Sequence, residues 1–112
     1  MLNIDSKIEE HLKICNKIHQ LYIDKNSDYG DSVNDTFKKF GMDAFLVRMY
    51  DKLNRVYSLT RTQAEAKVND EKIEDTLLDL ANYAMIALVE LKNEKSNLCQ
   101  RAKEVGYNEN IW

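Results

Sequence analysis

The sequence predicts a small all-α protein, and three observations lead to that fold class. Proline is absent from the whole chain, so no residue breaks a helix by removing a backbone donor. The three glycines, Gly30, Gly41 and Gly106, each stand where a helix is expected to stop. Between them, apolar residues recur at three- and four-residue steps, and little resembles a strand. We therefore expect an α-helical bundle.

Length and charge restrict the class of protein further. With 112 residues there is room for one domain, 1–112. So short a chain buries only a limited core, which makes a homo-oligomer the expected state. The net charge is −3 with both signs interspersed, which argues against binding to duplex nucleic acid. It does not argue against binding one small anion in a local basic pocket.

From the sequence we expect neither a targeting segment nor a membrane-spanning segment. The N-terminal residues lack a basic stretch followed by an apolar run. The longest apolar segment, 77–91, is interrupted by polar residues and is shorter than the ~20 residues that span a bilayer. Cys15 and Cys99 have no Cys-x-x-Cys spacing, which is typical of plain thiols in a reducing compartment. We expect a soluble, cytoplasmic protein with no membrane partner.

The first helix is expected to begin near Ser6 and end near Lys25. Ser6 and Glu9 have the spacing of a capping box, and an apolar stripe follows from Ile8 to Tyr22. Residues 26–32 have the composition of a turn.

Two further helices follow in the central part of the chain. A short helix over 33–40 should end at Gly41, and Asp43 is expected to cap a second long helix over 44–59. Residues 60–67 are polar and poorly periodic, which indicates a loop or a frayed helix.

A third long helix is expected after Asn69. Asn69 is a good N-cap, with Val68 and Ile73 placed for a hydrophobic staple. The helix is expected to break near 93–96 and to stop at Gly106, leaving a short tail over 107–112.

The third long helix carries an acidic sector in apolar surroundings. Glu71, Asp75, Asp79 and Asn82 fall within a narrow sector of one helix face. From Thr76 onward the helix is apolar on nearly every side, which indicates burial. Buried carboxylates need partners, so Asp79 and Asn82 should meet polar groups from another helix.

The second long helix offers such groups. Arg48, Asp51, Lys52 and Arg55 share one face, opposite an apolar stripe of Leu46, Met49, Tyr50, Leu53 and Tyr57. The three cations could pair with the acidic sector or bind phosphate, for which arginine is geometrically suited. The acidic stripe also fits a solvated helix face, and the whole set fits an internal salt-bridge network without any ligand.

Three sequence runs appear together in a fixed order. They are KNSDYGDS at 25–32, VRMYDKLNR at 47–55, and DE at 70–71 followed by EDTLLDLANYA at 74–84. Over residues 20–90 they resemble the nucleotide modification associated domain 1 family of phages and their hosts. That family is in turn similar to the all-α nucleotide pyrophosphohydrolases of the MazG and dimeric dUTPase type.

The resemblance implies a bundle of about four helices, assembled as a dimer or tetramer, with sites between helices. It also implies Mg²⁺ held by acids on two adjacent helices, and hydrolysis of a nucleoside triphosphate to monophosphate and pyrophosphate. Carried over, Asp51, Asp75 and Asp79 would be catalytic, and the same three with Glu71 would hold the metal. The nucleotide would be bound by Lys25, Asp28, Tyr29, Arg48, Lys52, Arg55 and Asn82.

The chain departs from the pyrophosphohydrolase pattern in its acids. Where those enzymes carry an E-E-x-x-E cluster, this sequence has only Asp51 among cations. Where an E-x-x-D pair would place an acid, it has Thr76. A pocket with more cations and fewer carboxylates binds phosphate without requiring a metal.

Three functions therefore remain open. The first is a Mg²⁺-dependent pyrophosphohydrolase. The second is a protein without a cofactor that sequesters a nucleotide, in a phage setting a signal of host immunity. The third is a structural or interaction domain.

Overall fold

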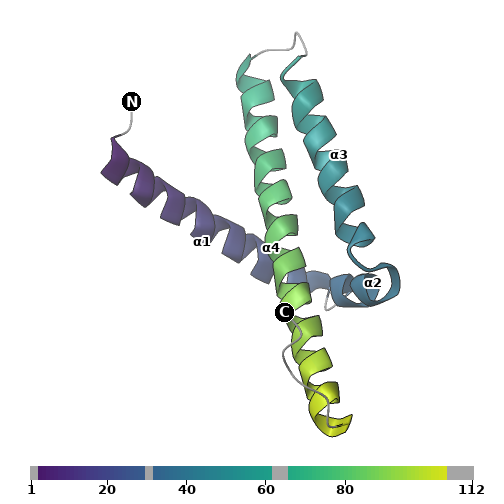
Figure 1. The fold of residues 1–112 in the computed structure, drawn as a ribbon. Helices are drawn as coiled ribbons and strands as arrows, with labels where there is room; N and C mark the ends of the chain where they lie inside the picture. The colour runs from purple at the N-terminus through teal and green to yellow at the C-terminus, as the bar shows by residue number, and fades with distance from the viewer. Residues whose placement is uncertain (1–2, 30–31, 62–65, 106–112) are drawn as a thin grey trace.

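The computed structural model describes residues 3–29, 32–61 and 66–105. They form the four helices α1 (Ile4–Tyr29), α2 (Ser32–Phe40), α3 (Asp43–Leu59) and α4 (Ala66–Val105) (Figure 1). No strand occurs among the described residues. The predicted all-α fold class is therefore confirmed. The expected C-terminal tail, 107–112, lies outside the described residues.

Helix α1 is longer than expected at both ends. It begins at Ile4 because the Asn3 side chain caps it, with Asn3 Oδ1 accepting a hydrogen bond from the Ser6 backbone at 2.8 Å. The predicted cap at Ser6 is therefore wrong. At the other end the helix continues through the predicted turn to Tyr29, since no proline or glycine precedes Gly30.

The turn between α2 and α3 matches the prediction at Gly41. Its φ of +66° is a conformation that side-chain-bearing residues rarely adopt, and its backbone nitrogen donates to the Phe37 carbonyl at 2.7 Å. The cap of α3 differs from the prediction. The N-cap is Met42, which makes no side-chain hydrogen bond, and Asp43 is already the first helical residue.

Helix α4 is one continuous helix of 40 residues. It starts at Ala66, so Asn69 lies inside the helix and does not cap it. Ala66 and Lys67 are strong helix formers, which extends the helix upstream. The expected break at 93–96 is also wrong. Asn93 and Ser96 have low helix propensity, but without a proline or glycine they do not end the helix. The described helix ends at Val105, and Gly106, the predicted stop, lies outside the described residues.

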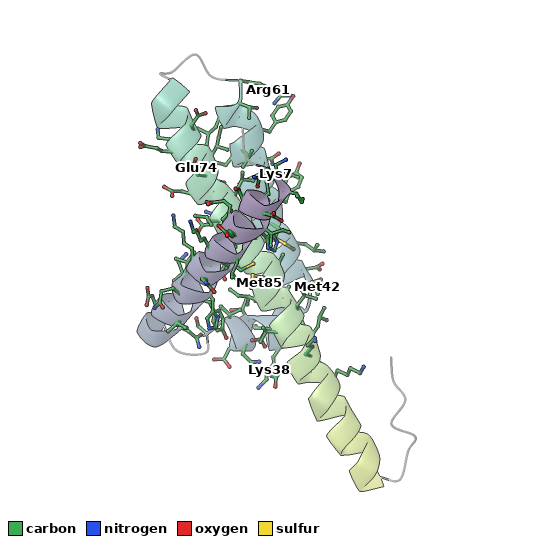
Figure 2. All side chains as sticks on the ribbon, turned by 90° about the vertical axis from the view of Figure 1, so that its left-hand side faces the viewer. Lys7, Lys38, Met42, Arg61, Glu74 and Met85 are labelled. Carbon is green, nitrogen blue, oxygen red and sulfur yellow. The ribbon has the colours of Figure 1, made fainter. Side chains whose placement is uncertain are left out.

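Helix α4 is the axis of the fold. Its first half lies antiparallel beside α3, while α1 crosses it obliquely near the middle (Figures 1 and 2). Its second half extends beyond the other helices in both views. Helix α2 lies between the ends of α1 and α3 (Figure 1).

The main hydrophobic core lies where α2, α3 and α4 meet. Phe37, Phe45, Ile86 and Ala87 are buried there, and the two phenylalanine rings lie 5.6 Å apart between centroids. Among the described residues, the buried polar side chains are nearly as numerous as the buried apolar ones: Asn34, Thr76, Asn82 and Glu90. All four lie on α2 or α4, so the interior beside the core is polar.

The single chain is extended. Its radius of gyration is 18.1 Å, whereas a compact domain of 100 residues has about 13 Å. Of the apolar stripe predicted on α3, Met49 packs against the core, whereas Leu46, Tyr50, Leu53 and Tyr57 are more than half exposed. Within the described residues, none of the helices has the length and hydropathy to cross a membrane.

Candidate functional site

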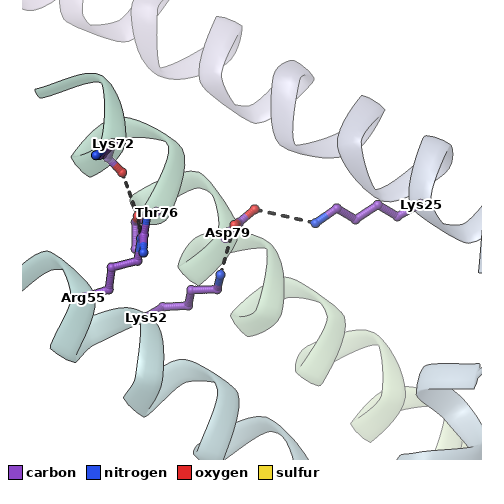
Figure 3. Close-up of polar contacts among 6 residues, drawn as sticks. All are labelled: Lys25, Lys52, Arg55, Lys72, Thr76 and Asp79. Carbon is purple, nitrogen blue, oxygen red and sulfur yellow. Dashed lines mark hydrogen bonds and ion pairs between the residues drawn. The ribbon is translucent and has the colours of Figure 1, made fainter. Parts of the chain in front are cut away.

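A carboxylate at the crossing of three helices forms the centre of the site. Asp79 on α4 has Lys25 of α1 on one side and Lys52 of α3 on the other (Figure 3). Its Oδ1 lies 3.7 Å from Lys25 Nζ, and its Oδ2 lies 3.3 Å from Lys52 Nζ. The Asp79 side chain is 29% exposed, so the group is accessible from solvent. The expected pairing of the acidic sector with the second long helix is observed here, and α1 adds a cation to it.

One turn before Asp79, a buried threonine holds an arginine. Thr76 is 3% exposed, and its hydroxyl donates to the Lys72 carbonyl at 2.7 Å. The same oxygen accepts a hydrogen bond from Arg55 Nε at 3.3 Å (Figure 3). Thr76 therefore fixes the Arg55 side chain against α4.

Arg48 extends the row of cations along α3. Its guanidinium lies 5.9 Å from the centroid of the Tyr83 ring. In the part of the chain that the structure describes, neither Arg48 nor Arg55 makes an ion pair with an acid. The four cations Lys25, Arg48, Lys52 and Arg55 thus form a row beside Asp79, and only Lys25 and Lys52 contact its carboxylate. We call this row the basic cleft.

Two open cavities adjoin the basic cleft and share Arg48 and Tyr83. The outer cavity, of about 360 Å³, is lined by Asp51, Lys52 and Arg55 in addition. The inner cavity, of about 300 Å³, runs toward α2 and the core. Besides Arg48 and Tyr83, its wall includes Tyr22, Lys25, Asn82 and Glu90.

The inner cavity contains buried polar groups. Asn82 is 4% exposed, and its Oδ1 accepts no hydrogen bond within the described residues. Glu90 is 6% exposed, and its Oε2 accepts a hydrogen bond from Nδ2 of Asn34, which is buried on α2. Asn34 and Glu90 were not among the residues predicted for the site. Glu90 left a signal in the sequence, because it is a charge inside an apolar helical run.

The remaining acids of the predicted metal site do not gather. Asp51, Glu71 and Asp75 are exposed, and both oxygens of Asp79 face lysines. Within the described residues, no group of three or more metal-ligating side chains lies close enough to hold an ion. The described residues of this single chain therefore do not bring the predicted Mg²⁺ ligands together.

Two predicted nucleotide contacts cannot be placed. Asp28 and Tyr29 belong to the last turn of α1, but their side chains lie outside the described residues. Their neighbours on either side, Asn26 and Ser32, line the inner cavity. The end of α1 and the start of α2 therefore close that cavity.

The fold and the site define a small all-α protein with a row of cations along α1 and α3, facing α4. The family model for nucleotide modification associated domain 1 matches residues 25–91. That match covers more than half of the chain and includes every residue of the basic cleft. The chain belongs to the nucleotide modification associated domain 1 family. Comparisons with curated proteins and with solved structures gave no match.

Proposed function

We propose that this protein binds a nucleotide by its phosphates in the basic cleft and holds it without hydrolysis. The observation that carries the proposal is a row of four cations from α1 and α3: Lys25 and Lys52 flank the partly exposed Asp79 carboxylate, Thr76 holds Arg55 one turn away, and Arg48 lies over Tyr83. Arginine presents a planar fork of donors that matches phosphate oxygens, and lysine adds a mobile charge. The family match supports a nucleotide as the ligand.

Asp79 has a definite part in this function. Without a ligand, its carboxylate keeps Lys25 and Lys52 close together despite their like charges. A phosphate is a second anion for the same two lysines, so the ligand shares or replaces the Asp79 contacts. Because Asp79 is partly exposed, this exchange needs no unfolding of the helices.

The second candidate, Mg²⁺-dependent pyrophosphohydrolysis, is favoured by the acidic sector of α4. Asp75 and Glu71 lie about one and two turns before Asp79, respectively, on the same helix. For these acids to hold a metal, Asp79 must leave its two lysines and further carboxylates must approach it. In this single chain, sequestration therefore requires less movement of side chains than metal-dependent hydrolysis does.

A binding and recovery experiment separates the two functions. The purified protein is incubated with nucleoside triphosphates and cyclic nucleotides, with Mg²⁺ or with EDTA, and is then denatured. Released nucleotides are identified by chromatography and mass spectrometry. Sequestration predicts an intact nucleotide, bound equally well in EDTA. Monophosphate and pyrophosphate that appear only with Mg²⁺ would replace this proposal with the hydrolase.

Arg55→Ala provides the matched test of the cleft. A hydrogen bond to a charged group contributes about 1.5–3 kcal/mol, so its loss should weaken nucleotide binding about tenfold or more. Lys38→Ala is the control, since Lys38 is an exposed cation on α2 that lines neither cavity. Equal effects of the two variants in isothermal titration calorimetry would show that only overall charge matters.

A further inference from the structure

The charge of the surroundings changes along one face of α4, and the part of this face from Asn82 to Glu90 borders the inner cavity. At one end, the surroundings of Thr76 and Asp79 are cationic. In the middle, Asn82 and Ile86 are uncharged. At the far end, Glu90 is a buried carboxylate. Asn82, Ile86 and Glu90 lie four residues apart, so they share one face of the helix.

Glu90 is a buried carboxylate that contacts a neutral group. In the described part of the chain it forms no ion pair, and the amide of Asn34 donates a hydrogen bond to it. A buried carboxylate without a cation is costly unless its oxygens receive hydrogen bonds. A carboxylate offers about four lone-pair sites, so one bond from Asn34 leaves capacity for further donors.

Asn82 gives an independent indication of a ligand. Its carbonyl oxygen is buried beside the cavity and makes no hydrogen bond among the described residues. A buried acceptor without a donor costs about 1–3 kcal/mol. A ligand that supplies a donor at this point removes that cost. The cavity therefore presents two buried acceptors, at Asn82 and at Glu90.

We propose that the inner cavity is a guanine-recognition subsite, with Glu90 as its specificity-determining residue. This inference rests on the proposed function, since the phosphates of the same nucleotide occupy the basic cleft. A carboxylate pairs best with two adjacent N–H donors. Guanine presents such a pair in its N1–H and 2-amino group. Adenine and cytosine place a ring acceptor beside the amino group, and uracil places carbonyls on both sides of its N–H.

The remaining parts of the ligand fit the order of groups along α4. Eleven residues separate Asp79 from Glu90, which is about 16 Å along a helix at 1.5 Å per residue. This span suits a nucleotide whose phosphates lie at Lys25 and Lys52 and whose base lies at Glu90. Asn82, between them, accepts from a sugar hydroxyl. Tyr22 and Tyr83 supply aromatic surface to the same cavity.

The first test measures the affinity of the full-length protein for guanosine, inosine and adenosine 5′-diphosphates in EDTA, with inorganic pyrophosphate as a probe that lacks a base. Inosine retains N1–H but lacks the 2-amino group. We expect guanosine diphosphate to bind about tenfold or more tightly than inosine diphosphate, the usual range for one base contact. We expect pyrophosphate to bind more weakly than either.

The second test changes the carboxylate to an amide. Glu90→Gln keeps an acceptor for Asn34 but places an amide N–H₂ where one carboxylate oxygen stood. The amide donor now meets the guanine 2-amino group, so preference should move to xanthosine diphosphate, which has a carbonyl there. Glu74→Gln is the control, since it removes an exposed carboxylate of α4 that does not line the inner cavity.

The outcomes separate this inference from the proposed function. If pyrophosphate binds but the three nucleotides bind equally, guanine recognition is overturned and the phosphate cleft stands. If neither pyrophosphate nor any nucleotide binds, both are overturned. If Glu90→Gln merely weakens all nucleotides alike, Glu90 is a structural tie between α2 and α4, which also overturns the inference. If Glu90→Gln does not fold, the affinities of the wild-type protein for guanosine and inosine diphosphates still test guanine recognition, and equal affinities overturn it.

Discussion

Thr76 shows how one residue decides what kind of site this helix can form. An acid at this position could join Asp79 in a metal site, whereas a threonine accepts a hydrogen bond from Arg55 and so supports a cation. The acidic sector was visible in the sequence, because helical periodicity places its members on one face. That both oxygens of Asp79 face lysines from two helices was not visible, because Lys25 is far away in sequence and reaches Asp79 only through the crossing of α1 and α4.

We predict that Thr76→Val weakens nucleotide binding severalfold. The variant keeps the shape of the side chain but removes the oxygen that holds Arg55 Nε, so the guanidinium loses its fixed position. The separate variant Thr76→Ser retains the hydroxyl and should bind like the wild type. If Thr76 acted only by packing, Thr76→Ser would not be expected to bind better than Thr76→Val. Calorimetric titration with a nucleoside triphosphate measures both variants. Identical affinities of Thr76→Val and the wild type would show that Thr76 does not contribute to nucleotide binding.

At the scale of elements, glycine located the end of α2 correctly. Gly41 marks that end because glycine lowers the cost of the backbone conformation that terminates a helix. The start at Ser6 was misplaced because Asn3 caps the helix upstream, and the start at Asn69 because the helix formers Ala66 and Lys67 precede it. Glu90 of the inner cavity and its partner Asn34 were missed because their contact joins α2 to α4, and no local pattern encodes it.

The α2–α3 turn gives a prediction at this scale. Gly41→Ala should destabilise the fold by about 1–2 kcal/mol, the cost of a left-handed backbone for a residue with a Cβ atom. Steric overlap adds nothing, because a Cβ atom at Gly41 meets no other atom within 4 Å. Gly41→Asn should cost less, since asparagine tolerates this conformation better. Urea unfolding followed by circular dichroism measures both, and an unchanged midpoint for Gly41→Ala would contradict the turn described here.

For the molecule as a whole, the open shape and the exposed apolar stripe belong together. The stripe on α3 was recognisable as apolar in the sequence, but sequence periodicity does not tell which partner covers it. In this chain only Met49 of the stripe packs against the core, and the other four members, Leu46, Tyr50, Leu53 and Tyr57, are between 52% and 64% exposed. Such a row on a monomer is typical of an interaction surface. We propose that a second copy of the chain covers it.

This proposal predicts a native mass of at least twice the chain mass of 13.1 kDa. The double variant Leu46→Glu and Leu53→Glu should shift the protein to 13.1 kDa, because it places charges on the stripe. Since both side chains are already exposed in the single chain, its helical content should not change. Light scattering after size exclusion gives the mass, with Lys38→Glu as the charge control. A wild-type mass of 13.1 kDa would contradict the proposal.

The measurement that most directly tests the central claim is the affinity of Asp79→Asn for a nucleoside triphosphate, titrated in EDTA beside the wild type. If the cleft binds phosphate by its cations alone, removing the competing carboxylate strengthens binding. The Coulomb energy of about 1 kcal/mol for one charge at 4 Å in water corresponds to about fivefold. We therefore predict tighter, metal-independent binding. Binding that requires Mg²⁺ and is lost in Asp79→Asn would contradict the account and make Asp79 a metal ligand.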